Sequence, residues 1–178
     1  MSITQEKQKN IFSQIKDKFD YKNISQSPKI EKVVVSTGVG SMKDKKKIET
    51  IVDRLSKITG QKPLARPAKK SIATFKLRQG DIVGYQVTLR GKRMYDFLDK
   101  LIHIALPRTR DFRGIKRSSI DEMGNISIGI KEHTIFPEVS DEDIRDIFGL
   151  SITITTSAST KEEVEELLLG VGFPLQKK

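Results

Sequence analysis

The 178-residue sequence contains no cysteine. A chain without thiols forms neither a disulfide framework nor a thiolate metal site, and this composition fits the reducing cytosol. The sequence also lacks any apolar run near the roughly 18 to 20 residues that cross a bilayer, and its N-terminal segment has no signal-peptide core. We therefore expect a soluble, cytoplasmic protein with no membrane partner.

Residue patterns that support catalysis are also scarce. The only two histidines, His103 and His133, lie far apart in the sequence, and His103 falls off the apolar stripe of its predicted helix, which indicates a surface position. Gly38 and Gly40 follow a predicted strand, but no third glycine or Gly-Lys-Ser/Thr completes a nucleotide-binding motif. No serine stands in a nucleophile elbow, and no carboxylate pair lies in an apolar setting. The sequence therefore predicts no enzyme, cofactor, metal site or small-molecule substrate.

Charge is abundant and unevenly distributed. The chain carries 33 Lys and Arg against 23 Asp and Glu, for a net charge of +10 and a pI of about 9.7. Residues 1–60 sum to +6, residues 61–119 to +11 and residues 120–178 to −7. Basic surfaces attract polyanions because phosphate contacts release condensed counterions. The middle third is therefore the candidate anion-binding region, although solvated helix faces also display such charge.

The length fits one domain spanning residues 1–178. Apolar periodicity predicts helices over 4–19, from 44 to 60, from 92 to Pro107, over a short stretch within 140–149 and from Thr160. Alternating or β-branched segments predict strands at 29–36, 83–90, 126–130 and 150–155, while 61–80 suggests short strands and a long basic loop. These elements predict an α+β fold with a mainly antiparallel open sheet, helices packed on one face and RNA on the other.

The residues expected on the uncovered sheet face share an unusual chemistry. They are small, neutral and able to form hydrogen bonds, whereas solvated faces usually carry more Lys and Glu. Such a flat surface suits the wide minor groove of RNA with its 2′-hydroxyls. The alternative is a plain solvated face on which Thr serves strand propensity. The set comprises Ser36, Gln86, Thr88, Ser127, Gly129, Ser151, Thr153 and Thr155.

One aromatic residue, Phe75, lies within the basic loop between Lys69 and Gly80. An aromatic side chain between cations can stack on a nucleobase or pack against a folded RNA. It can equally plug the core. The sequence leaves both interpretations open.

Six segments of the chain resemble a known family. They are GQKP (60–63), KSIATFKLRQG (70–80), VTLRGKRMYDFL (87–98), LPRTRDFRG (106–114), IFPE (135–138) and GLSITITT (149–156). In order and spacing they closely resemble the bacterial large-subunit ribosomal protein five family, along nearly the whole chain. The resemblance implies a structural 5S rRNA-binding protein of the central protuberance of the ribosome. It also implies 23S rRNA, P-site tRNA, small-subunit ribosomal protein thirteen and neighbouring large-subunit 5S rRNA-binding proteins as partners.

The resemblance and the charge pattern together assign three sets of candidate residues. RNA is expected to dock on the open face through positions matching Ser36, Gln61, Phe75 and Thr88. The loop matching 74–82 is expected to reach the elbow of P-site tRNA, and segments around 108–117 and 136–148 to form an intersubunit bridge. The 5S rRNA set is Ser36, Gln61, Lys62, Lys69, Lys70, Phe75, Thr88 and Arg90; the tRNA set is Thr74, Lys76, Leu77, Arg78, Gln79 and Gly80; and the bridge set is Arg108, Arg110, Arg113, Asp141, Glu142, Asp143 and Asp146.

Two other classes of function compete with this interpretation. One is a basic enzyme acting on nucleotides, which turnover of ATP or GTP would reveal. The other is a free RNA chaperone or translational regulator, which would bind RNA broadly without sedimenting with ribosomes.

Overall fold

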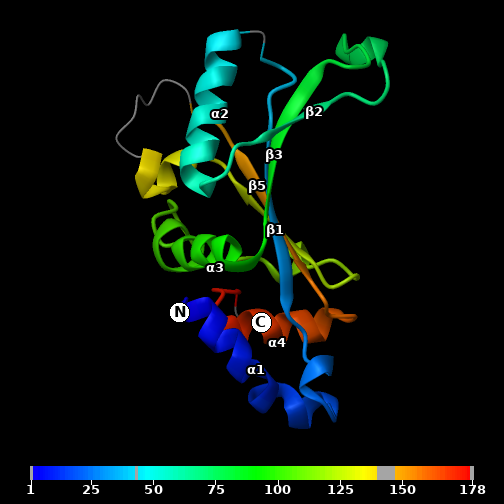
Figure 1. Ribbon diagram of the computed structural model, residues 1–178, viewed down its shortest axis with the longest axis vertical. Coiled ribbons are helices and arrows are strands. Elements are labelled where there is room, and N and C mark those ends of the chain that lie inside the picture. Colours follow the sequence, from blue (N-terminus) through cyan, green and yellow to red (C-terminus); the bar gives the residue numbers. More distant parts are fainter. Residues whose placement is uncertain (1, 43, 140–146, 177–178) are drawn as a thin grey trace. The chain divides into compact units, whose positions relative to one another are not determined.

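The computed structural model describes residues 2–42, 44–139 and 147–176 (Figure 1). Its described part contains five strands and four α-helices, which confirms the predicted α+β fold. The strands are β1 (Ile30–Gly38), β2 (Leu64–Pro67), β3 (Ile82–Leu89), β4 (Ile126–Ile130) and β5 (Leu150–Thr156). The helices are α1 (Ile3–Phe19), α2 (Lys45–Thr59), α3 (Gly91–Lys100) and α4 (Lys161–Val171).

The strands form one open antiparallel sheet in the order β2-β3-β1-β5-β4. The edge strand β2 pairs with β3 so that Leu64 faces Gln86 and Arg66 faces Gly84, and the register shifts at Pro67. Proline has no N–H to donate, so it belongs on such an edge. Burial alternates along β4 and β5, as a half-covered strand requires.

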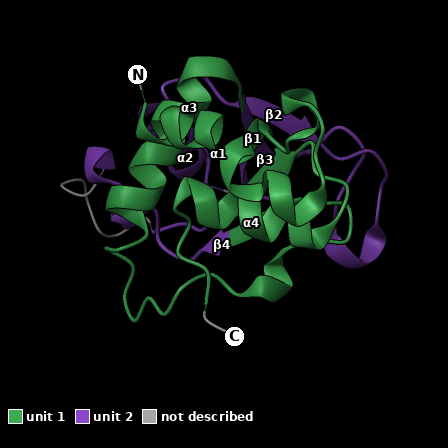
Figure 2. Cartoon of the chain, turned by 90° about the horizontal axis from the view of Figure 1, so that it is seen from below, with its two compact units in different colours: residues 1–33, 89–128, 153–178 green, residues 34–88, 129–152 purple. Residues whose placement is uncertain are grey.

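The chain divides into two compact units (Figure 2). The first unit comprises residues 1–33, 89–128 and 153–178, and the second comprises residues 34–88 and 129–152. The boundaries cut four of the strands, so each unit is assembled from segments that are distant in sequence. The single domain over 1–178 stays a prediction, because this division does not test it.

In the second unit, α2 begins and ends where the sequence predicts. The Asp44 side chain accepts a hydrogen bond from the Lys46 N–H, and Gly60 takes a left-handed conformation with φ of 66°. An N-cap acceptor satisfies an otherwise unpaired helix donor, and glycine terminates helices because it adopts positive φ without strain. Ile51, Leu55 and Ile58 form the buried face of this helix.

The first unit contains α1, α3 and α4. A Cβ on Gly170 would lie 3.1 Å from the Ile11 side chain, so α1 and α4 pack closely there and a larger residue would require the Ile11 side chain to shift by a few tenths of an ångström. After Lys100 the α3 helix continues as one π-helical turn, Leu101–Ala105, which the sequence did not predict. His103 is exposed on this turn, as expected.

The N-terminus of α1 is capped from another helix. The Asp99 carboxylate of α3 accepts hydrogen bonds from the hydroxyls of Ser2 and Thr4 and from the backbone N–H groups of Ile3 and Thr4. Burial alone would raise the pKa of Asp99, but these donors outweigh it and the pKa lies below its ordinary value. Asp99 therefore replaces the local N-cap, since Ser2 makes no side-chain cap of its own.

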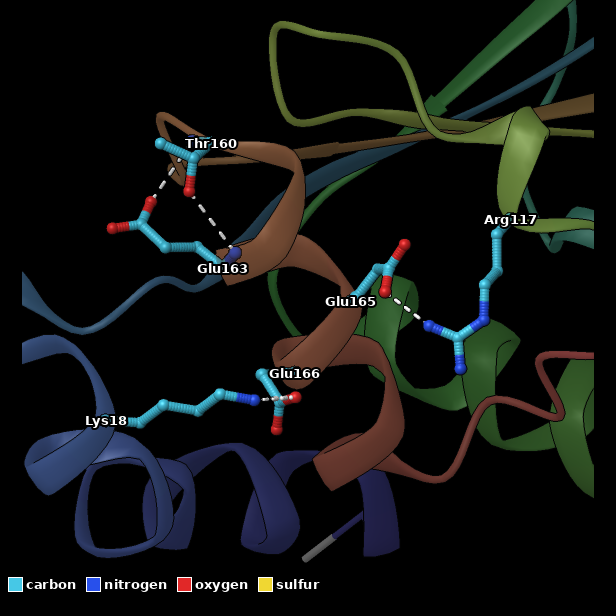
Figure 3. A network of polar contacts seen from close by, with 6 residues as sticks. All are labelled: Lys18, Arg117, Thr160, Glu163, Glu165 and Glu166. Carbon is cyan, nitrogen blue, oxygen red and sulfur yellow. Dashed lines mark hydrogen bonds and ion pairs between the residues drawn. The ribbon is translucent and has the colours of Figure 1, made fainter. Parts of the chain in front are cut away.

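Helix α4 begins with the predicted capping box (Figure 3). The Thr160 hydroxyl accepts from the Glu163 N–H at 3.3 Å, and the Glu163 carboxylate accepts from the N–H groups of Ser159 and Thr160. Two further carboxylates of this helix make ion pairs, Glu166 with Lys18 and Glu165 with Arg117. Part of the acidic charge of the last third is therefore used inside the first unit.

One polar group interrupts the core of the second unit. Arg54 and His133 are both buried, and Nη1 of Arg54 lies 3.1 Å from Nε2 of His133. The His133 ring stacks on Phe148 with centroids 4.1 Å apart. Nδ1 of the same ring lies 3.3 Å from the Phe148 backbone nitrogen, so both ring nitrogens face a donor group. The predicted short helix at 140–149 lies largely outside the described residues, and the described Ile147–Gly149 is irregular.

Candidate nucleic-acid interface

The polar positions of the sheet are accessible where the sequence predicts it. In the second unit, Ser36 on β1 and Gln86 on β3 are half-buried and Thr88 is exposed, while their neighbours Val35 and Val87 point into the core. The remaining members of the set lie on β4 and β5. Ser127, Gly129 and Ser151 are exposed there, and Thr153 and Thr155 are half-buried.

The structure brings Gln61 and Thr88 together, although 27 residues separate them in sequence. The side-chain amide nitrogen of Gln61 donates a hydrogen bond to the backbone carbonyl of Thr88 at 3.4 Å. The backbone carbonyl of Gln61 accepts a hydrogen bond from the Thr59 hydroxyl at 3.1 Å. These contacts hold the turn after α2 against β3. Lys62, the next residue along the chain, is exposed.

Glycines keep parts of this face flat. A Cβ on Gly84 would lie 2.7 Å from the Thr37 carbonyl oxygen, so the close approach of β3 to β1 forbids any side chain there. The exposed Gly38 and Gly129 differ, because nothing lies within 4 Å of a Cβ built on either residue. Glycine in a strand without steric need often marks a place that another backbone approaches closely.

Hydrogen bonds within the basic loop between β2 and β3 connect its two sides. Ile72 and Leu77 exchange backbone bonds of 2.9 and 3.2 Å across a short turn over Ala73–Phe75, with Lys76 in the left-handed region. At its base, the Ala68 N–H donates to the Asp81 carbonyl at 2.8 Å, and the Asp81 carboxylate accepts from the Arg78 N–H. In Figure 1 the loop extends beyond the end of the β2–β3 pair.

Phe75 lies in this loop and is 75% exposed, so it does not plug the core. It occupies the same turn as Thr74 and directly precedes Lys76. Phe75 therefore lies in the loop that carries the tRNA set, and its assignment to the 5S rRNA set stays a prediction. Thr74, Lys76, Arg78, Gln79 and Gly80 are exposed, and Leu77 is half-buried.

The remaining cations are distributed over both units. Lys69 and Lys70 are exposed at the start of the loop, in the second unit. Arg90, Arg108, Arg110 and Arg113 are exposed in the first unit. Asp141, Glu142, Asp143 and Asp146 lie outside the described residues.

Sequence reasoning missed two residues of this surface. Arg66 on the edge strand β2 donates from Nε to Oε1 of Gln86 at 2.5 Å, and Asp81 closes the loop. Both lie in the segment 61–82, whose irregular pattern hid the register of β2 on β3. Only the pairing of the two strands brings Arg66 beside Gln86.

These features define a class of protein. Within the described ranges there is no group of three or more His, Cys, Asp or Glu side chains that could hold a metal ion. No helix in these ranges is both long and apolar enough to cross a membrane. The fold presents an accessible polar sheet face and an exposed basic loop, and these two features are typical of a binding protein.

Comparison with known proteins specifies this class. Residues 23–78 match the family described as ribosomal protein L5, and residues 82–175 match the model of the C-terminus of the same ribosomal family. The chain is 49% identical to the large ribosomal subunit protein uL5 of Halothermothrix orenii, over 99% of this chain and 100% of that protein. The chain therefore belongs to the ribosomal protein L5 family, whose members are structural, non-enzymatic components of the large ribosomal subunit.

Proposed function

We propose that this protein binds 5S rRNA on the open face of its sheet and attaches it to the central protuberance of the large subunit. The observation that carries the proposal is the accessible row of small polar residues, with Ser36 and Thr88 in the second unit. Hydroxyls and amides at strand spacing can meet the 2′-hydroxyls and base edges of an RNA minor groove. The family membership supplies the class of partner.

Affinity on this surface would come from its exposed cations. Lys62, Lys69 and Lys70 border the open face or its loop, and Arg90 directly follows β3. Cations that contact phosphates displace condensed counterions, so log K should fall by roughly 0.7 to 0.9 per contact for each unit of log salt. On this proposal the neutral residues of the open face determine how the RNA docks, and the cations provide most of the affinity.

The loop from Thr74 to Ile82 is proposed to contact P-site tRNA. Its internal hydrogen bonds preorganise Phe75, Lys76 and Arg78, so binding loses little conformational entropy. An exposed aromatic beside cations is suited to stacking on an unpaired base or packing on the folded tRNA surface. The bridge to small-subunit protein thirteen, through Arg108, Arg110, Arg113 and the acidic 141–146 segment, is proposed from the family resemblance and the charge distribution.

The central test is the binding of the isolated full chain to 5S rRNA over a range of salt concentrations. We expect a steep negative slope of log K against log salt. Replacing Lys69, Lys70 and Arg90 with Ala should reduce the magnitude of that slope by about 2 to 3, which is the sum expected for three phosphate contacts. An unchanged slope would place the basic RNA-binding surface elsewhere, and absence of 5S rRNA binding would overturn the proposal.

A further inference from the structure

We propose that Arg66 is a fixed phosphate-binding residue of the open sheet face and that Gln86 is its positioning residue. The inference rests on the proposed RNA-binding function and adds a contact that the family resemblance did not indicate. Arg66 is exposed on the edge strand β2. Its guanidinium donates from Nε to Oε1 of Gln86 on β3 at 2.5 Å.

The strand register places this pair on the side proposed to face RNA. Arg66 stands opposite Gly84, and Leu64 stands opposite Gln86, so Arg66 reaches diagonally to Gln86 on one face of the β2–β3 pair. Gln86 alternates with the buried Val87 and shares its side with the exposed Thr88. Arg66 therefore lies on the same face as Thr88, whose carbonyl is held by Gln61.

The bond to Gln86 leaves the chemically useful end of the guanidinium available. Only Nε is used, and the two Nη groups form the edge of the fork that donates parallel hydrogen bonds to a phosphate. Among the residues that the structure describes, no carboxylate forms an ion pair with Arg66, so its charge is not neutralised within that part of the chain. A neutral glutamine fixes the side chain without that neutralisation.

The surroundings of Arg66 favour a nucleic-acid backbone over an acidic peptide. The position opposite, Gly84, cannot carry a side chain, and the exposed Gly38 leaves open space above β1. A sugar–phosphate chain can therefore lie close to the sheet beside the guanidinium. Lys69 and Lys70, exposed three and four residues further along the same hairpin, are of the same sign.

Because Gln86 only orients Arg66, removing either residue should have a different effect on the RNA affinity and on its salt dependence. An arginine already held in one geometry loses little side-chain freedom when it binds. Removing Gln86 should therefore weaken binding without changing the number of phosphates neutralised. Removing the Arg66 charge should change both the affinity and the salt dependence.

The test measures 5S rRNA affinity and its salt slope for the full chain and for Arg66→Gln, Arg66→Lys, Gln86→Leu and the double variant Arg66→Gln/Gln86→Leu. Lys161→Gln, which removes one exposed charge from the start of α4, is the matched control for net charge. Circular dichroism checks that each variant folds, as expected for exposed or half-buried positions.

We expect Arg66→Gln to weaken binding about tenfold near 0.1 M salt and to reduce the slope by roughly 0.7 to 0.9. Arg66→Lys and Gln86→Leu should each weaken binding severalfold with the slope unchanged, and the double variant should match Arg66→Gln alone. If the unaltered chain binds 5S rRNA while Arg66→Gln behaves like Lys161→Gln, the assignment of Arg66 is overturned and the proposed function stands. If the unaltered chain does not bind 5S rRNA, the proposed function itself fails.

Discussion

Gly129 lies in the exposed part of β4 without a steric or conformational need to be glycine. Glycine in a strand interior is less stable than alanine by roughly 0.5 to 1 kcal/mol, so its presence is unfavourable unless something approaches the strand. Gly84 differs, because the Thr37 carbonyl excludes every other residue from its position. The structure therefore explains the glycine at position 84 and gives no steric reason for the one at position 129.

We predict that Gly129→Val leaves the free energy of unfolding unchanged or raises it by up to about 1 kcal/mol, because valine favours strands and nothing lies within 4 Å of a Cβ at this position. The same change should weaken 5S rRNA binding tenfold or more by holding the RNA away from the sheet. Urea unfolding and filter binding measure the two effects, with Gly129→Ala as a smaller graded change. Full affinity in the valine variant would remove this part of β4 from the interface.

A second prediction at the residue scale concerns Asp99. Asp99→Ala should lower the free energy of unfolding by about 1 kcal/mol, since it removes the acceptor that caps α1. The pKa of Asp99 lies below its ordinary value of 3.8 in the folded protein, so its contribution is present above that value and lost as the pH falls through the lowered pKa.

Urea titrations at pH 7, 4 and 3 test this sign. The difference in the free energy of unfolding between the native chain and Asp99→Ala should have its full value at pH 7 and should become smaller toward pH 3. An exposed substitution on the same helix, Asp96→Ala, controls for loss of a carboxylate without the cap. A difference that grows on acidification would contradict the assigned role.

At the scale of elements, the β2–β3 hairpin combines a sheet edge with an ordered basic tip. The edge carries Arg66, and the tip carries Phe75, Lys76 and Arg78. Separate surfaces on one hairpin can serve separate RNAs, since the loop closes on itself through Asp81 and depends little on the rest of the sheet.

We therefore predict that Lys76→Ala with Arg78→Ala leaves 5S rRNA affinity within about twofold of the native value. Both side chains are exposed at the tip of the loop, so the open face should remain intact. Retention of P-site tRNA on assembled ribosomes should fall, because two phosphate-attracting charges are lost. Binding of labelled tRNA to reconstituted ribosomes measures this retention, with Lys161→Ala as a control. Loss of 5S rRNA binding in the double variant would contradict the proposal that the loop binds tRNA and the open face binds 5S rRNA.

For the whole molecule, the charge distribution separates candidate RNA-facing from candidate protein-facing regions. Residues 61–119 carry +11 and residues 120–178 carry −7. Carboxylates repel phosphates within the Debye length of about 8 Å, whereas they attract a basic protein. Within the last third, Glu165 and Glu166 already pair with Arg117 and Lys18 (Figure 3), so the acidic residues of 141–146 become the candidates for an external partner.

Neutralising Asp141, Glu142, Asp143 and Asp146 should spare 5S rRNA binding and weaken association of the two ribosomal subunits. The loss should be larger at low salt, because exposed ion pairs contribute roughly 0.2 to 1 kcal/mol each and are screened. Light scattering of matched ribosomes at two salt concentrations measures it, and neutralising Glu162 in α4 is the control. Association that is unaltered at both concentrations would rule out an electrostatic bridge at this segment.

The local features of this protein could be predicted from its sequence because short-range physics controls them. Asp44 and Gly60 bound α2, Thr160 and Glu163 start α4, and period-two alternation marks β4 and β5, since these two helix boundaries and the strand alternation depend on neighbouring residues. The same alternation predicts the open face and its small polar residues without reference to the strand pairing.

Tertiary structure alone decided the contacts between segments distant in sequence. Asp99 caps α1 across 95 residues, Gln61 reaches Thr88, Arg66 reaches Gln86, and Arg54 lies buried against His133. The exposure of Phe75, which the sequence left undecided between core and surface, also follows from the folded loop. Periodicity and composition do not decide which strands become neighbours. Alternation excludes only register slips that reverse the two faces of a strand, and these contacts exist only once the strand order and the full register are set.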